Sequence, residues 1–240
     1  MPNSYFQFKE FIVHQEKCAL KVCTDSCLFG AWVADKTGNM GFAPKNLLDI
    51  GTGTGLLSLM VAQKTAAQID AVELDINAFN QASENFKNSS WSDRIRAFHS
   101  DIKLFKPRHK YDLIISNPPF FQNDLLSKNN EKNASKHGST LTLEELINLV
   151  KNLLTDEGKF AVLLPWKKAD DFEKSASLIF LYAESKVEVK QTPAHNYFRT
   201  MFIFGKKNTF SEKKSLTIKN SDNAYPTEFA ELLKDYYLYL

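Results

Sequence analysis

The chain has 240 residues, of which 43% are hydrophobic and 24% are charged, and its formal net charge is +2. These values are close to the average for folded proteins. They exclude a disordered chain, which would lack the apolar surface needed to offset the entropy lost on ordering. Nine glycines and eight prolines exclude a collagen-like or low-complexity polymer. The longest apolar runs, residues 160–166 and 177–183, are far shorter than the roughly 18 residues that a membrane span needs.

Hydrophobic patterns predict strands that alternate with helices along most of the chain. The predicted strands cover residues 46–50, 69–74, 94–99, 111–116, 160–164, 187–190 and 198–204. The predicted helices cover residues 56–64, 77–87, 143–154, 168–180 and 226–237, with Asp75 as a helix cap and Pro226 in the last helix's first turn. This alternation predicts an α/β fold with a mostly parallel, seven-stranded sheet covered by helices on both faces. The last two strands leave little room for a helix between them, so one strand is expected to be antiparallel.

We expect a single domain over residues 1–240. It would consist of an N-terminal extension (1–45), a Rossmann-like core (46–210) and a C-terminal tail and helix (211–240). Residues 121–142 are polar and rich in Asn, Lys and Ser, and a connection of this length inside a compact domain is usually functional.

The cysteines and the N-terminus bear on the compartment and on metals. Cys18, Cys23 and Cys27 are odd in number and do not repeat a CxxC unit, so we predict reduced, mostly buried thiols and no metal site. No basic region followed by an apolar core begins the chain, which predicts a cytoplasmic protein that does not bind membranes.

Three glycines, Gly51, Gly53 and Gly55, fall within five residues between the first predicted strand and its helix. Glycine allows positive φ and close approach of a ligand, and the carboxyl end of a parallel strand is where nucleotide-like ligands bind. The third glycine comes one residue earlier than in the GxGxxG turn of NAD-binding proteins. Asp49, just before the turn, would repel a pyrophosphate but suits a cationic ligand such as S-adenosyl-L-methionine (SAM). The alternative is a tight turn needed only for packing.

Acidic residues also follow the next two predicted strands. Glu73 ends the second strand, at about the distance where an acid meets a ribose diol, and Asp101 follows the third, where it could meet an adenine amino group. Each alone could be a solvated carboxylate at a strand end. Together with Asp49 they favour SAM over NAD.

The segment Asn117-Pro118-Pro119-Phe120 follows the fourth predicted strand. The two prolines fix φ and remove two N–H groups, so they predict a rigid turn. The side-chain oxygen of Asn117 and the carbonyl of Pro118 could accept hydrogen bonds from an exocyclic amine, a poor nucleophile because its lone pair is delocalised into the ring. Phe120 could stack on the base. SAM would supply the methyl group, and the protein position and electrostatics. The alternative is a plain Pro-Pro turn.

The glycine turn, the acids and this tetrapeptide together resemble class I SAM-dependent methyltransferases that methylate amino groups. The likeness extends over nearly the whole chain to the bacterial tRNA1(Val) adenine-N6 methyltransferases, through residues 6–11, 18–22, 24–25, 28–32 and 225–240. That family methylates the adenine at tRNA position 37, beside the anticodon. The resemblance implies the class I methyltransferase fold and activity, S-adenosyl-L-homocysteine as product, and the tRNA anticodon loop as partner. We expect a monomer.

The resemblance also implies a role for each candidate residue. The cofactor would be held by Lys21, Thr24, Asp25, Asp49, Gly51, Gly53, Glu73, Asp101, Ile102 and Asn117. The target base would be held by Asn117, Pro118, Pro119 and Phe120. Residues 186–219 contain eight Lys or Arg residues against two Glu residues, an excess that suits RNA phosphates. We predict nucleic-acid contacts by Lys128, Lys132, Arg199, Lys206 and Lys207.

Three other functions remain open at this stage. A protein glutamine-N5 methyltransferase uses the same tetrapeptide chemistry, but such enzymes usually carry a separate N-terminal helical domain. A small-molecule methyltransferase would leave the basic stretch unexplained. A non-catalytic RNA-binding protein that retains a SAM pocket is the third, although the intact motifs argue against decay.

Overall fold

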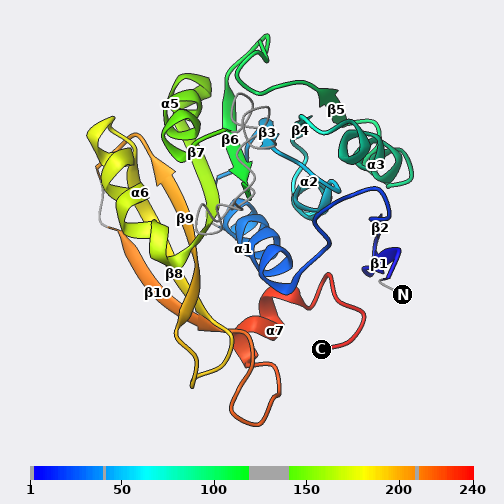
Figure 1. The fold of residues 1–240 in the computed structure, drawn as a ribbon, viewed down its shortest axis with the longest axis vertical. Coiled ribbons are helices and arrows are strands. Elements are labelled where there is room, and N and C mark those ends of the chain that lie inside the picture. The colour runs from blue at the N-terminus through cyan, green and yellow to red at the C-terminus, as the bar shows by residue number, and fades with distance from the viewer. Residues whose placement is uncertain (1–2, 40–41, 119–140, 209–210) are drawn as a thin grey trace, which may run out of the picture.

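The computed structural model describes residues 3–39, 42–118, 141–208 and 211–240 (Figure 1). The main sheet has eight strands in the order β10-β8-β9-β7-β6-β3-β4-β5. They are β3 (Asn46–Ile50), β4 (Gln68–Glu73), β5 (Ile95–His99), β6 (Tyr111–Ser116), β7 (Leu154–Pro165), β8 (Tyr182–Lys190), β9 (Tyr197–Gly205) and β10 (Glu212–Thr217). Neighbouring strands pair in parallel except at β7–β9 and β8–β9, so β9 alone is antiparallel within this sheet.

The predicted α/β fold with one antiparallel strand is confirmed, but the predicted number of seven strands is wrong. The eighth strand, β10, pairs in parallel with β8 at one side of the sheet. It lies within residues 211–240, which were expected to form a tail and a helix. Its middle residues Lys213, Lys214 and Ser215 are exposed, and Leu216 is buried. An edge strand this polar lacks the apolar alternation that identifies a strand in a sequence.

Helices cover both faces of the sheet, as predicted (Figure 1). One hydrophobic cluster joins the sheet to α1 (Thr24–Asn39), α2 (Leu56–Ala62), α3 (Ile76–Lys87) and α7 (Thr227–Leu233). A second cluster joins the opposite face to α5 (Leu143–Leu153) and α6 (Trp166–Leu178). The central strands therefore have both faces buried, which is why they read as continuous apolar runs in the sequence.

Most helix boundaries follow from local signals. Asp75 caps α3, as predicted: its Oδ1 accepts hydrogen bonds from the backbone N–H groups of Asn77 (3.0 Å) and Ala78 (2.9 Å). Helix α7 is shorter than the predicted 226–237, because Pro226 lies at the N-cap and the helix ends at Leu233. The sequence did not predict α1, because the middle of this helix is apolar on every side and is buried between α2, α7 and the sheet.

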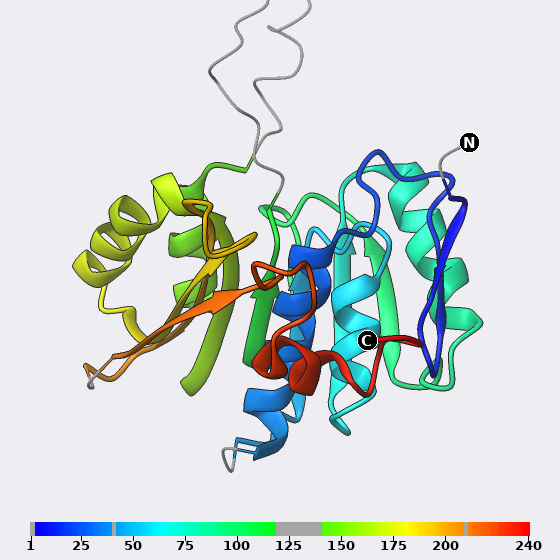
Figure 2. The same ribbon diagram turned by 90° about the horizontal axis from the view of Figure 1, so that it is seen from below.

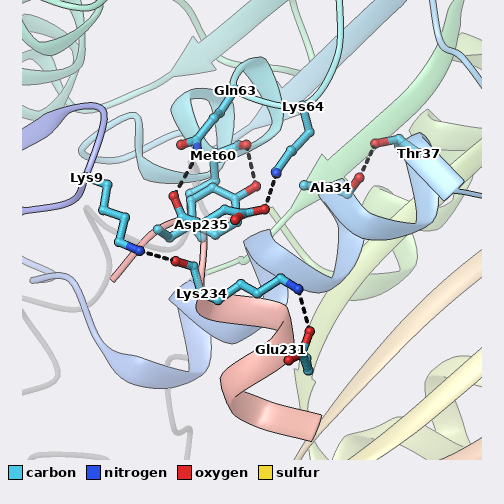
Figure 3. Close-up of polar contacts among 10 residues, drawn as sticks. Lys9, Ala34, Thr37, Met60, Gln63, Lys64, Glu231, Lys234 and Asp235 are labelled. Carbon is cyan, nitrogen blue, oxygen red and sulfur yellow. Dashed lines mark hydrogen bonds and ion pairs between the residues drawn. The ribbon is translucent and has the colours of Figure 1, made fainter. Parts of the chain in front are cut away.

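The two ends of the chain are tied to the core by specific contacts. Strands β1 (Tyr5–Gln7) and β2 (Ile12–His14) form a small antiparallel sheet. At the C-terminal end, Asp235 forms an ion pair with Lys64, and its backbone carbonyl accepts a hydrogen bond from Gln63 (2.9 Å) (Figure 3). The hydroxyl of Tyr236 donates to the carbonyl of Met60 (2.9 Å). The C-terminal segment thus packs on α2.

The cysteines carry no disulfide bond. Cys18 and Cys27 are buried, as predicted, whereas Cys23 is exposed. Burial is the largest of the causes that raise the thiol pKa, to about 11 for Cys18 and about 12 for Cys27. Within the described ranges, no group of His, Cys, Asp or Glu residues is arranged to hold a metal ion, and no helix is long and apolar enough to cross a bilayer.

Candidate cofactor and base-binding site

The candidate site lies where the chain changes direction across the sheet. From β3 the chain proceeds outward through β4 and β5 and then returns to β6 on the other side of β3. Ligands of open α/β sheets bind at such a switch point, outside the carboxyl ends of the strands. Ile50 pairs with Ser116, and the Ser116 hydroxyl donates to the Ile50 carbonyl (2.9 Å). Gly51 and Asn117, the next residue on each strand, therefore leave the sheet side by side.

The glycine turn needs glycine for two different reasons. Gly51, Gly53 and Gly55 have φ of 71°, 57° and 84°, in the left-handed region that favours glycine. A Cβ on Gly51 or Gly53 would meet nothing within 4 Å, so this side of the turn is open. A Cβ on Gly55 would lie 2.4 Å from Cε1 of Phe86. The first two glycines thus form an open cradle, and the third allows α3 to pack against the turn.

Asp49 lies beneath this turn and is completely buried. Its Oδ2 accepts hydrogen bonds from the hydroxyls of Thr52 (2.6 Å) and Ser58 (2.7 Å). Its Oδ1 is buried and accepts no hydrogen bond from the described residues. Burial is the main cause that raises the pKa of this carboxyl to about 6, partly offset by the two hydroxyls. An under-solvated carboxylate is a source of negative potential at the open cradle.

Glu73 and Asp101 lie at the ends of the two strands beyond β3. One oxygen of Glu73 accepts the backbone N–H of Gly53 (2.8 Å), and the other accepts those of Leu74 and Asp75 (each 2.9 Å). Glu73 therefore clamps the glycine turn to the end of β4. Asp101 is half-buried and accepts the backbone N–H of Lys103 (2.9 Å).

Ile102, the apolar member of the predicted adenine-binding pair, is buried beside Asp101. The carboxyl ends of β3, β4 and β5 are adjacent in the sheet, so the acids that follow these strands share one edge.

Asn117 is held by a residue that is distant in the sequence. Its Nδ2 donates to the hydroxyl of Ser26 (2.9 Å), which is 7% exposed and belongs to the first turn of α1. The Ser26 hydroxyl also contacts Cys23 Sγ (3.0 Å). Asn117 Oδ1 accepts no hydrogen bond from the described residues, so the amide presents its acceptor. Pro118 follows directly, whereas Pro119 and Phe120 lie outside the described residues.

The N-terminal candidates meet the basic candidate Arg199 at the same place. Thr24 and Asp25 begin α1, and Asp25 Oδ2 forms an ion pair with Arg199 Nε (2.7 Å). The ammonium group of Lys21 donates to the backbone carbonyl of Gln15. Arg199, predicted as a nucleic-acid contact, thus lies beside residues predicted to face the cofactor.

Two other basic candidates, Lys206 and Lys207, do not join this site. Pro165, at the carboxyl end of β7, pairs with Arg199, whereas Phe160 pairs with Phe204. Lys206 and Lys207 follow the far end of β9, about 20 Å from Arg199 along the strand. They pair with Asp156 (3.4 Å) and Glu157 (2.6 Å). Lys128 and Lys132 lie outside the described residues.

Figure 2 shows the same separation. The N-terminal end of α1 and the turn between β8 and β9 lie on the upper side of the molecule, and the carboxyl end of β9 lies at the lower left.

Sequence analysis missed Ser26, Thr52 and Ser58. Ser26 is 91 residues from Asn117, and no local pattern connects them. Thr52 lies within the glycine turn, so its position beside Asp49 could have been found, and Ser58 lies in the first turn of the following helix. The hydroxyls of Thr52 and Ser58 make the burial of Asp49 tolerable, because buried carboxylates need hydrogen-bond donors.

The residues present fit SAM, whose methionine end carries an ammonium and a sulfonium group. The open glycine cradle admits a ligand to the backbone, and the buried Asp49 carboxylate with an unpartnered oxygen favours a cation there. A pyrophosphate in this cradle would instead face the carboxylates of Asp49 and Glu73.

Comparison with known proteins agrees with this geometry. The family model "Methyltransferase small domain" matches residues 21–168. A tRNA1(Val) (adenine(37)-N6)-methyltransferase from Dyadobacter fermentans is 42% identical over 98% of each chain, and one from Trichodesmium erythraeum is 39% identical over 99% of each.

Solved structures show the same fold at low sequence identity. A predicted O-methyltransferase from Agrobacterium tumefaciens has a TM-score of 0.67 at 15% identity, covering 88% of this chain and 96% of its own. A methyltransferase from Pyrococcus furiosus has a TM-score of 0.53 at 21% identity, covering 74% of this chain and 82% of its own.

Proposed function

This chain belongs to the family of tRNA1(Val) (adenine(37)-N6)-methyltransferases, and we propose that it transfers a methyl group from SAM to N6 of adenine 37 in tRNA1(Val). The single observation that carries the proposal within the structure is the position of Asn117. It leaves β6 beside the glycine turn, with its amide nitrogen bound to Ser26 and its oxygen presented as an acceptor.

In the proposed reaction the protein positions the adenine amine and does not need a strong general base. Bound SAM supplies an electrophilic methyl group. The exocyclic amine of adenine is planar and weakly nucleophilic, so it must be held in line and allowed to become pyramidal. Asn117 Oδ1 and the Pro118 carbonyl accept its two N–H groups. The methylated nitrogen is acidic enough to lose its proton to water, so no strong general base is required.

Ser26 fixes which end of the Asn117 amide faces the base. An amide that rotated would present N–H groups to N–H groups and repel the substrate. The hydrogen bond at 2.9 Å to Ser26 opposes this rotation. Pro119 and Phe120 complete the proposed base pocket, with Phe120 as the stacking ring.

We assign the cofactor to the edge formed by the ends of β3, β4 and β5. Gly51 and Gly53 admit the methionine end, and Asp49 attracts its positive charge through the turn, since this carboxylate is buried rather than in the open. Glu73 is assigned to the ribose. Asp101 and Ile102 are assigned to the adenine of the cofactor, and Lys21, Thr24 and Asp25 to the margin of the methionine end.

The finer calls extend the proposal. The contacts that tie both chain ends to the core, such as Asn85 Nδ2 with the carbonyls of His14 and Thr54 (each 2.8 Å), support one domain that acts as a unit. We propose a monomer that acts in the cytoplasm on the anticodon loop.

Asn117→Ala tests the proposed role. We expect SAM affinity by calorimetry to stay within about twofold, and kcat on an unmodified tRNA1(Val) transcript to fall at least about 100-fold. Asn80→Ala, which removes an exposed asparagine of α3, is the matched control and should change neither. Loss of SAM binding together with turnover would make Asn117 structural. Full activity would remove the proposed mechanism.

A further inference from the structure

An exposed aromatic and basic surface lies at the same edge of the sheet as Asn117. It is formed where β7 passes into α6 and where β8 and β9 meet. We call it the edge surface. It consists of the exposed residues Trp166, Lys167 and Lys168 and the half-buried residues Lys190 and Tyr197. None of these residues belongs to the candidate site described above.

The edge surface flanks the base-binding site. Val162 of β7 pairs with Ser116, and Pro165 lies three residues further along, about 10 Å beyond the end of β6. Pro165 pairs with Arg199, whose guanidinium contacts Asp25 next to Ser26. The contacts from Asn117 to the start of β9 are therefore continuous.

The indole of Trp166 is the exposed aromatic ring of the edge surface, and it is held in place by the half-buried Tyr197 and by Glu188. Trp166 is 40% exposed, and its ring stacks on Tyr197 with centroids 6.1 Å apart and an interplanar angle of 28°. The indole N–H of Trp166 donates a hydrogen bond to the Glu188 carboxylate (2.6 Å), so the nearby acid is already hydrogen-bonded. Lys190 Nζ lies 4.6 Å from the centre of the Tyr197 ring. An indole fixed from two sides loses little entropy when a further ring stacks on it.

The basic part of the edge surface differs from Lys206 and Lys207 in its ion pairing. Lys167 and Lys168 are exposed, and neither they nor Lys190 form an ion pair with any acid in the described ranges. In contrast, Lys206 and Lys207 at the opposite edge are both paired with acids. Unpaired ammonium groups are the ones that can neutralise phosphates.

We propose that the edge surface binds the anticodon stem-loop of the tRNA, with Trp166 stacking on an unpaired base and Lys167 and Lys168 contacting backbone phosphates. Single-stranded RNA is recognised by aromatic rings on which bases stack, next to positive charge that follows the backbone. An acidic peptide would use the lysines but would gain little from the indole face. This inference rests on the proposed function, because it assigns how the same substrate is held.

The test measures binding and methylation of an unmodified anticodon stem-loop RNA that carries adenine at position 37. For Lys167→Gln/Lys168→Gln we expect the slope of log Kd against log salt to fall by about 1.4, the value for two phosphate contacts of a single strand. Lys45→Gln/Lys110→Gln makes the same charge change at exposed positions before β3 and β6, at the other edge, and should leave the slope unchanged. Trp166→Ala should weaken binding about tenfold, and Trp166→Phe less.

SAM affinity and far-UV circular dichroism of each variant separate RNA contact from misfolding. The inference is overturned if the wild type binds and methylates the stem-loop but the edge variants bind it equally well. It is also overturned if only Lys206→Gln/Lys207→Gln reduces the slope, which would place the RNA at the opposite edge. Unchanged RNA binding in the edge variants would contradict the proposal and would favour an acidic protein as the partner of the edge surface. If the wild type neither binds nor methylates the RNA, the proposed function itself fails.

Discussion

Replacement of the buried Asp49 by asparagine should make stability and cofactor binding change in opposite directions. The carboxyl pKa is raised from 3.8 to about 6, a difference that corresponds to about 3 kcal/mol against the charged form in the folded protein. Between these two pKa values the folded protein binds a proton that the unfolded chain does not. The free energy of unfolding therefore decreases as pH rises through this window. Asp49→Asn removes this decrease.

The clearest signature is a difference between two pH values. Asparagine keeps an oxygen for the Thr52 and Ser58 hydroxyls but places N–H groups where Oδ1 has no partner, a penalty of about 1–2 kcal/mol that does not depend on pH. From pH 4.5 to 7.5 the variant should gain about 2 kcal/mol relative to the wild type. At pH 7.5 the variant should be as stable as the wild type or more stable, yet bind SAM about tenfold more weakly because the attraction to its positive charge is lost.

Urea unfolding at both pH values and calorimetric titration with SAM give these quantities. A stability difference that is the same at pH 4.5 and 7.5 would refute the account of Asp49 as a buried carboxylate under desolvation. Equal SAM affinity in the variant would refute its role in attracting the cofactor.

Three further outcomes follow from the same contacts. In the wild type, SAM affinity should fall as pH drops below about 6, because the proton on Asp49 removes the charge, and in Asp49→Asn this pH dependence should disappear. Ser26→Ala should lower kcat about three- to tenfold and leave KM for SAM unchanged. Ser26→Thr keeps the hydroxyl and should retain most of the activity. An equal loss of activity in both variants would indicate that Ser26 acts through packing. Gly55→Ala should lower the free energy of unfolding by about 2–4 kcal/mol, because the new Cβ adds strain at positive φ and collides with Phe86. Gly53→Ala adds the strain alone and should lower it by about 1–2 kcal/mol. Equal losses in the two variants would exclude the collision with Phe86.

The sequence predicts the central fold well because its signals are local. Buried parallel strands such as β3, in which Leu47, Leu48 and Ile50 are buried, are short apolar runs. Helices α2, α3 and α5 follow β3, β4 and β6. Asp75 shows its capping role through its position alone. The edge strand β10 and helix α1, whose middle is apolar on every side, carry no such pattern, and sequence analysis missed both. It also missed the short strands β1 and β2.

The candidate site divides in the same way. Asp49, Gly51, Glu73 and Asn117 are recognisable because each lies at the end of a strand, and the topology brings these ends together. Ser26 is not recognisable, because its contact with Asn117 exists only after α1 packs on the sheet.

The basic stretch 186–219 shows why linear charge is a poor guide to surface charge. Lys186, Arg199, Lys206 and Lys207 all pair with acids that lie outside the stretch. The excess of positive charge in the sequence is therefore largely neutralised in the folded protein. Lys167 and Lys168 lie outside the stretch, yet they are exposed, unpaired with described acids and next to an exposed indole.

A position-resolved methylation assay tests whether this protein methylates N6 of adenine 37. The protein is incubated with deuterium-methyl SAM and a tRNA1(Val) transcript, and the RNA is digested and mapped by mass spectrometry. We expect labelled N6-methyladenosine at position 37 and none in a transcript with guanosine there. Label at another nucleotide, or no label in RNA from a protein that binds SAM, would contradict it and direct attention to a different acceptor, such as a protein amide or a small molecule.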